Sequence, residues 1–263
     1  VPPNDSKVVD NSFGRGSNMA IGGDVKYRIA SNLTLDATVN PDFGQVEADP
    51  SQVNLTAFES WYEEKRPFFT EGAELFGGGF PTLFYSRRIG ARPRGTVPRE
   101  AEFADVPERT TILGAARLTG RTAGGWSVGL MDAVTARESA PWSAADSGGS
   151  ETVEPLANHF VGRVGRDFRR GGSWLGGTLT AVNRATEDGE VPGSRVAGAY
   201  VAGVDGRHRF GGDRYQVEGA LRGSYVAGSP AALAAVQRSP VRLFQRPDAD
   251  HLRLDPALTS LGG

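Results

Sequence analysis

The sequence predicts an all-β protein: an antiparallel up-and-down transmembrane β-barrel, incomplete in this chain, with an inserted plug-like segment. The first observation behind this fold class is the alternation of side chains in residues 196–226. Every second residue there is small, aliphatic or aromatic, and the residues between them include charged groups such as Glu218 and Arg222. A period of two is typical of extended strands with one apolar and one polar face.

The second observation is strand length. The runs on either side of residues 211–213 are each about as long as a tilted membrane strand of ~9–11 residues, whereas strands of soluble proteins average ~5–6 residues. Long strands with this alternation favour a wet lumen and a lipid-facing wall. We expect these side chains to face outward: Val196, Tyr200, Val204, Tyr215, Val217 and Leu221. We expect these to face inward: Asp205, Arg207, Glu218 and Arg222.

The same alternation recurs in three earlier segments, residues 19–40, 111–135 and 158–184. Each contains two runs separated by a turn, which is the signature of a β-hairpin. Asp132 interrupts the apolar positions of the second segment. Together with residues 196–226, these segments predict about eight strands in four antiparallel hairpins.

The segments between the hairpins differ from one another. Residues 41–110 are dense in charge and aromatic rings and have no steady period, and they greatly exceed an ordinary hairpin loop of ~2–5 residues. Residues 136–155 are rich in Ser and Gly and predict a flexible surface loop. Residues 230–237 predict a short helix. We therefore treat residues 1–263 as one fragment of a barrel domain, with 41–110 as the plug or long insertion.

The first part of the insertion, residues 41–90, is expected to fold inward or to cap one end of the barrel, because its rings would form an apolar patch on an exposed loop. The rings expected to be buried are Phe43, Phe58, Phe68, Phe69 and Phe76. Nearby cations need partners because a buried unpaired charge is costly. We expect Arg66, Arg87 and Arg88 to meet carboxylates from this set: Asp42, Glu47, Asp49 and Glu71.

Composition excludes several functions. The chain has no cysteine, which excludes disulfides, thiol catalysis and cysteine-bound zinc. Its net charge of −2 gives no reason to expect a nucleic-acid partner. His159, His208 and His251 are widely separated, so we expect neither a histidine metal site nor a cofactor. No run approaches the ~20 apolar residues of a transmembrane helix. The first residues contain no signal peptide, so we expect an internal piece of a longer protein.

Two patterns raise the alternative of catalysis. Residues 125–129 satisfy the G-x-S-x-G pattern of serine hydrolases, but that motif needs a strand, a sharp turn and a helix. The strand alternation continues through Ser127, which predicts a lumen-facing strand residue. Asp42, Glu47 and Asp49 could bind calcium or form the carboxylate pair of a glycosidase. Structural pairing of these carboxylates with arginine is the favoured interpretation.

The rings of Trp61, Tyr62, Phe68 and Phe69 have two interpretations. They could stack on the C–H faces of sugars, or they could pack the insertion against the barrel wall, which we favour. If a carbohydrate site lies in this chain, we expect it where the insertion meets the lumen. The candidate binding residues are Glu47, Asp49, Trp61, Tyr62, Arg87 and Arg88. We assign no catalytic residue.

Several longer motifs resemble a known family. They are NPDFGQVEAD at 40–49, NLT at 54–56, EKRPFFTEG at 64–72, LFYSRRIG at 83–90, GAARLTG at 114–120, DAVT at 132–135 and FQRPDA at 244–249. The resemblance is to an uncharacterised bacterial family of outer-membrane barrels whose barrel region commonly follows an N-terminal carbohydrate-binding domain of the family-nine type. It implies location in the bacterial outer membrane. It also implies that the pattern continues into more strands after residue 263.

Two classes of function follow. The first is a non-enzymatic outer-membrane barrel that binds or passes a solute, with an oligosaccharide as the expected solute. The second is a hydrolase, acting on glycosidic bonds or through the serine motif. A soluble β-sandwich is disfavoured by the strand lengths. The expected partners are outer-membrane lipid, an oligosaccharide and the N-terminal carbohydrate-binding domain of the same longer chain, the last two by resemblance alone.

Overall fold

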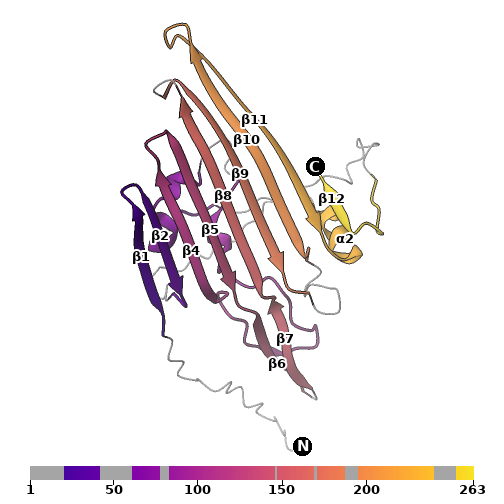
Figure 1. Cartoon of the computed structure of the whole chain (residues 1–263). Helices are drawn as coiled ribbons and strands as arrows, with labels where there is room; N and C mark the ends of the chain where they lie inside the picture. The colour runs from indigo at the N-terminus through magenta and orange to yellow at the C-terminus, as the bar shows by residue number, and fades with distance from the viewer. Residues whose placement is uncertain are drawn as a thin grey trace, which may run out of the picture.

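The computed structural model describes residues 21–41, 61–77, 83–145, 147–168, 171–186, 195–239 and 253–263. The fold is all-β, and its main element is one long antiparallel sheet (Figure 1). In spatial order its strands are β1 (Gly23–Ala30), β2 (Leu33–Val39), β4 (Ile112–Arg121), β5 (Trp126–Thr135), β8 (Ala157–Phe168), β9 (Ser173–Arg184), β10 (Gly198–Phe210), β11 (Tyr215–Ala227) and β12 (Ser260–Gly262).

This order confirms the four predicted hairpins and their up-and-down arrangement. β1 pairs with β2, β4 with β5, β8 with β9, and β10 with β11, all antiparallel. The short strand β12 adds to β11 at one edge. Within the described residues, β1 and β12 are the two edges of the sheet and are not paired with each other, so the sheet is open and forms no closed barrel.

Strand register confirms the predicted division of side chains between the two faces within β10 and β11. The prediction was wrong for Val196, which was expected to face outward. It lies before β10 and packs against Val226 and Leu233. Val204 lies opposite Leu221, and the next residue, Asp205, lies opposite Ala220. Partners across an antiparallel pair point to the same side of the sheet. We call the side that carries Val204 and Leu221 the apolar face, and the side that carries Asp205 the polar face. The apolar face extends over the earlier strands through Val25, Tyr27, Leu35, Leu118, Leu130, Val164 and Leu179.

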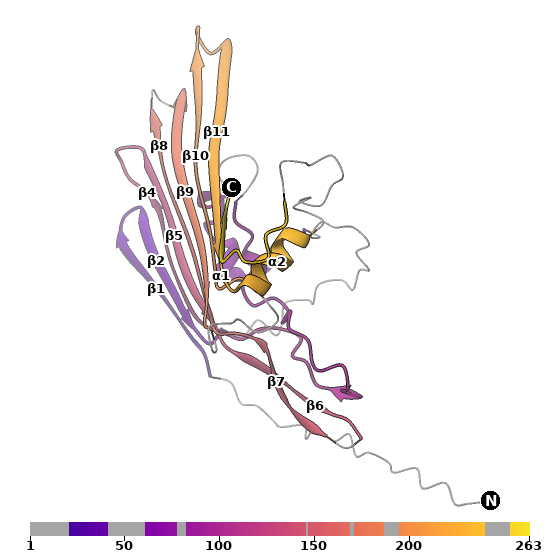
Figure 2. The ribbon, with the colours of Figure 1, turned by 90° about the vertical axis from the view of Figure 1, so that its right-hand side faces the viewer.

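The apolar face is exposed. Relative exposure reaches 75% at Leu221, 65% at Val25 and 62% at Tyr27. The described helices lie on the opposite side of the sheet (Figure 2). Asp132, which interrupts the apolar pattern, accepts a hydrogen bond from Asn158 on the neighbouring strand (2.8 Å).

Aromatic rings gather towards both ends of the apolar face. Tyr200 and Tyr225 approach to 6.3 Å between ring centroids near one end of β10 and β11. Near the other end, Phe210 stacks with both His208 and Tyr215. Between these two groups the same face of β10 and β11 carries small and aliphatic side chains. They are Ala202, Val204, Gly206, Val217, Gly219, Leu221 and Gly223.

The segment after the first hairpin packs on the polar face. It contains α1 (Pro67–Thr70), η1 (Ala73–Leu75) and η2 (Ser86–Arg88). Phe69 and Phe76 are buried in one cluster with Met131 and Val161 of the sheet, which confirms two of the five rings expected to be buried. Phe68 packs against this cluster and is partly buried. Phe43 and Phe58 lie outside the described residues.

A second sheet corrects the prediction of a flexible loop at residues 136–155. Strands β3 (Phe103–Ala104), β6 (Glu138–Ser143) and β7 (Gly148–Glu154) form a three-stranded antiparallel sheet. Ala140 and Val153 are fully buried. The ring of Trp142 lies against Gly149, where an added Cβ would stand 3.3 Å from the indole nitrogen. The Ser and Gly content concealed this hairpin, because its packing depends on a few well-separated residues.

The remaining helix, α2 (Pro230–Arg238), confirms the short helix predicted at 230–237. The Ser229 side chain caps it by accepting a hydrogen bond from the backbone of Ala232 (3.3 Å), and Pro230 occupies its first turn. Leu233 and Ala232 pack against Val226 of β11. No helix in the described part of the chain is long and apolar enough to cross a membrane.

Candidate functional site

A buried arginine joins the insertion to the polar face. Arg117 of β4 is 2% exposed and pairs with Asp36 of β2 at 2.9 Å. It also donates hydrogen bonds to the backbone carbonyls of Phe68 and Glu71. The carboxylate of Glu71 lies 3.5 Å from Arg117 and also pairs with Lys26 of β1. One guanidinium therefore connects two strands and the insertion.

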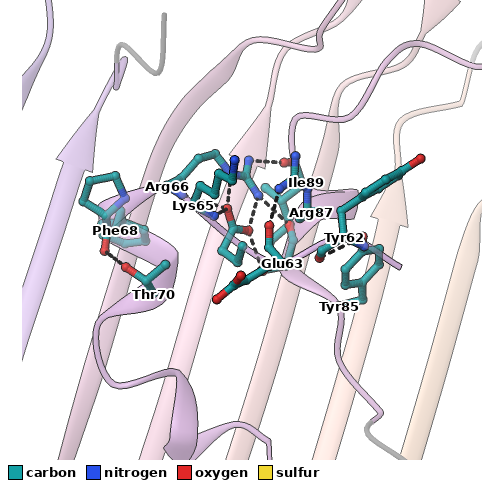
Figure 3. A network of polar contacts seen from close by, with 12 residues as sticks. Tyr62, Glu63, Lys65, Arg66, Phe68, Thr70, Tyr85, Arg87 and Ile89 are labelled. Atoms are coloured by element: carbon teal, nitrogen blue, oxygen red, sulfur yellow. Dashed lines mark hydrogen bonds and ion pairs between the residues drawn. The ribbon is translucent and has the colours of Figure 1, made fainter. Parts of the chain in front are cut away.

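A second network is internal to the insertion (Figure 3). Arg66 makes two contacts with the Glu64 carboxylate, at 2.8 and 2.7 Å. The same guanidinium donates to the carbonyls of Ser86 (2.9 Å) and Ile89 (2.6 Å). Its carbon lies 4.2 Å from the ring centroid of Phe69. These contacts bind the chain around residue 66 to the turn at 86–89, although 20 or more residues separate them.

The carboxylate partners differ from those expected from sequence. Arg66 pairs with Glu64, which was outside the predicted set, and Glu71 pairs with Arg117 and Lys26. Asp42, Glu47 and Asp49 lie outside the described residues. Glu64 and Arg66 are two residues apart, which was the signal available in the sequence. The chain is extended just before α1, and in an extended chain residues at this spacing point to the same side.

The Glu64 carboxyl predicts a dependence of stability on acid. Burial raises its pKa, but hydrogen bonds from Arg66 and Ser86 and the charge of Arg66 outweigh burial, so the pKa lies below its ordinary value. A depressed pKa stabilises the folded state above the unfolded pKa of ~4.3, and this stability is lost as pH falls through the folded pKa. We expect Glu64→Gln to remove part of the decrease in unfolding free energy between pH 5 and pH 3.

Urea unfolding at several pH values measures this effect, with Glu63→Gln as the matched control because Glu63 is an exposed neighbour. If the Glu64→Gln protein retains the acid sensitivity of the wild type, the assignment to Glu64 is wrong.

The structure brings together three of the six predicted site residues. Trp61 packs on Tyr85 with ring centroids 4.3 Å apart. The guanidinium carbon of Arg87 lies 5.8 Å from the ring centroid of Tyr62. Trp61 and Tyr62 line a cavity of about 220 Å³. Arg88 lines a different cavity. Glu47 and Asp49 lie outside the described residues.

A further aromatic residue, Trp174 of β9, lies flat on the polar face. An added Cβ at Gly165 would overlap the indole ring, and one at Gly176 would stand 2.8 Å from it. Gly165 of β8 and Gly176 of β9 are direct cross-strand partners. Two paired glycines thus form a bare patch of backbone on which the ring rests.

Polar contacts hold the Trp174 ring in this position. Its indole N–H donates to Asp205 of β10 at 3.0 Å. Arg163 of β8 binds the same carboxylate through both nitrogens, at 2.8 and 2.9 Å, and its guanidinium carbon lies 5.4 Å from the Trp174 ring centroid. A bidentate pair of this kind has a fixed geometry. The ring is therefore oriented before any ligand arrives.

The Trp174 ring lines a cavity of about 650 Å³ on the polar face. Its charged lining residues are Asp205, Arg207, Glu218 and Arg222. Such a volume is within the ~300–1,000 Å³ of small-molecule sites. We call this cavity the Trp174 site. An indole face beside carboxylates and guanidiniums offers apolar contact together with hydrogen-bond donors and acceptors.

Sequence reasoning placed four of these residues on the inward face but did not select Trp174. The available signal was a tryptophan among the polar positions of a strand, with glycines two residues after it and on the preceding strand.

Sequence reasoning did predict Ser127 correctly as a strand residue. It lies within β5, is buried, and donates to the carbonyl of Gly165 (3.4 Å), so the strand, turn and helix of a nucleophile elbow are not formed there.

These features define an all-β protein whose open antiparallel sheet has one exposed apolar face and one polar face bearing a long insertion. The chain belongs to an uncharacterised family, the domain of unknown function DUF5916, whose model matches residues 3–235. No curated protein and no solved structure matches the chain.

Proposed function

We propose that this chain is part of a bacterial outer-membrane β-barrel whose apolar face contacts lipid and whose polar face binds carbohydrate without covalent catalysis. The observation that carries the membrane part is the exposed apolar face, which extends across eight strands from β1 to β11. The six strands from β4 to β11 in this sheet have 10 to 13 residues each. Exposed apolar patches of soluble monomers rarely exceed a few hundred Å². A face of this extent is stable when hydrocarbon covers it.

The positions of the aromatic rings support this proposal. Tyr215 and Tyr225 stand at opposite ends of the aliphatic stretch of β11. Ten residues at ~3.4 Å each make about 34 Å along the strand, or about 26 Å across a membrane at a tilt of ~40°. Membrane barrels carry an apolar band ~25 Å tall between two aromatic girdles. The spacing of the two ring groups thus agrees with the thickness of an outer membrane.

The polar face then belongs to the lumen, and the insertion becomes its plug. Support comes from the packing of Phe69 and Phe76 on the polar side and from the contacts of Arg117 with Phe68 and Glu71. A buried charge with partners on both parts resists their separation. By resemblance, a carbohydrate-binding domain of the same longer protein precedes the barrel and delivers the same class of ligand.

The carbohydrate part of the proposal is supported by the Trp174 site. Sugars present flat C–H surfaces, which suit an indole face, and hydroxyls around their edges, which suit carboxylates and guanidiniums. The ring is already oriented by Asp205 and Arg163, so binding does not have to order it. The predicted residues Trp61, Tyr62 and Arg87 form a second aromatic surface on the same side of the sheet.

Tryptophan fluorescence tests both parts in one experiment. The chain has four tryptophans, and variants can retain Trp126 alone, on the apolar face, or Trp174 alone, on the polar face. In vesicles, we expect lipids brominated near the headgroup to quench Trp126 and to leave Trp174 unaffected. An oligosaccharide panel is expected to shift the emission of Trp174 and not that of Trp126.

The two parts fail separately. Equal quenching of both tryptophans by brominated lipid rejects the lipid-facing assignment. Quenching of Trp126 with no saccharide response at Trp174 retains the membrane part and rejects the carbohydrate site. Asp205→Asn serves as a positioning control, because we expect it to weaken saccharide binding while the lipid quenching of Trp126 is retained.

A further inference from the structure

A second cavity on the polar face is strongly basic. Its volume is about 550 Å³. Arg184, the last residue of β9, lines it, whereas Trp174 lies near the first residue of the same strand. Five arginines line it, from η2, the following loop, β9 and the residues just before β10: Arg88, Arg92, Arg94, Arg184 and Arg195. Glu154 is the single carboxylate among the described lining residues.

That carboxylate is already engaged. Arg195 donates to Glu154 at 2.6 Å, and the backbone N–H of Arg94 donates to the same oxygen at 3.2 Å. Among the described residues that line the cavity, five guanidiniums are therefore gathered around one carboxylate. Like charges gathered in a partly enclosed cavity repel one another, and they repel more strongly than in bulk water.

Arg184 shows that the donors are not all satisfied within the described chain. It is partly buried and donates one hydrogen bond, to the carbonyl of Val196 at 3.1 Å. Its Nε is buried and has no hydrogen-bond partner among the described residues. A buried N–H without a partner is costly, so the fold holds the Arg184 guanidinium beside this cavity at a cost in stability.

We propose that this cavity binds a small oxyanion, a phosphate or carboxylate group carried by a small molecule. Guanidinium forks match the paired oxygens of both groups, and a ligand of this charge relieves the repulsion between the arginines. Small alanines of α2, Ala232 and Ala235, and Gly90 form part of the remaining wall, which leaves room for an attached ring or chain. This site is independent of the carbohydrate assignment at Trp174.

Calorimetry on the full chain refolded in detergent tests this proposal, using inorganic phosphate and glucuronate as probes and glucose as the neutral comparison. We expect saturable binding of one or both anions and none of glucose. Arg184→Gln and Arg92→Gln are each expected to weaken anion binding about tenfold or more. Arg238→Gln, an exposed arginine of α2 outside the cavity, is the matched control and leaves binding unchanged.

The results that support or overturn the anion site are distinct. Arg92 is exposed, so the Arg92→Gln protein remains folded and decides the matter if Arg184→Gln does not fold. Phosphate binding without glucuronate binding identifies a phosphate site, and the reverse identifies a carboxylate site. Absence of saturable binding of both anions, or equal affinity in wild type and Arg92→Gln, overturns the proposal. Trp174→Phe is expected to retain anion binding, which separates this site from the saccharide site.

Discussion

We expect Leu221→Arg to lower the free energy of unfolding in lipid vesicles by about 2–4 kcal/mol, the cost of an arginine on the lipid side near the middle of a membrane barrel. Leu221 is 75% exposed on the apolar face, between the two groups of rings. Urea unfolding of the refolded chain in vesicles measures the change. The expected loss of stability comes from moving the charge into lipid, because an arginine at a strand position that faces water is tolerated.

The adjacent residue supplies the control. Ala220 belongs to the same strand, lies on the polar face and is paired with Asp205, so we expect Ala220→Arg to change the unfolding free energy much less. Equal effects of the two arginines would falsify the assignment of one face to lipid. This comparison keeps the strand, the introduced residue and the depth in the membrane nearly constant and changes the face alone.

The second large effect is expected at Arg117. Replacing it with methionine leaves the Asp36 carboxylate and the carbonyls of Phe68 and Glu71 without their donor. Removing one partner of a buried ion pair destabilises by about 3–5 kcal/mol. Because Arg117 also holds the insertion, we expect faster trypsin cleavage after Lys65 in the Arg117→Met protein.

The double variant Arg117→Met, Asp36→Leu tests the cause. It removes both charges, so we expect it to be more stable than Arg117→Met alone. If the single variant is as stable as wild type and its cleavage is equally slow, then Arg117 does not hold the insertion on the sheet.

The strands were predictable because their signal is local. Alternation in residues 196–226 sets the two faces, and a register slip of one residue would invert them. The hairpin of β6 and β7 was missed because Ala140 and Val153 are isolated apolar residues in a run of Ser, Gly and Glu. Barrel closure is a property of the sheet edges, which alternation within one strand does not specify.

The site shows the same limit. Alternation placed Asp205 on the polar face, and the structure confirms it. The role of Asp205 in orienting Trp174 depends on the pairing of three strands, β8, β9 and β10, and therefore on contacts between residues that are far apart in the chain. The pairing of Arg66 with Glu64 depends on an extended backbone before α1, which no periodic pattern indicates.

The two glycines beneath Trp174 have a consequence for how this family varies. Gly165, Gly176 and Trp174 occupy one shared volume, because the indole fills the space that side chains at both glycines would need. Any relative with a larger residue at either glycine position must reorient or lose the ring. These three positions are therefore expected to covary, so that a relative with tryptophan at the position of Trp174 is expected to have glycine at both of the other positions.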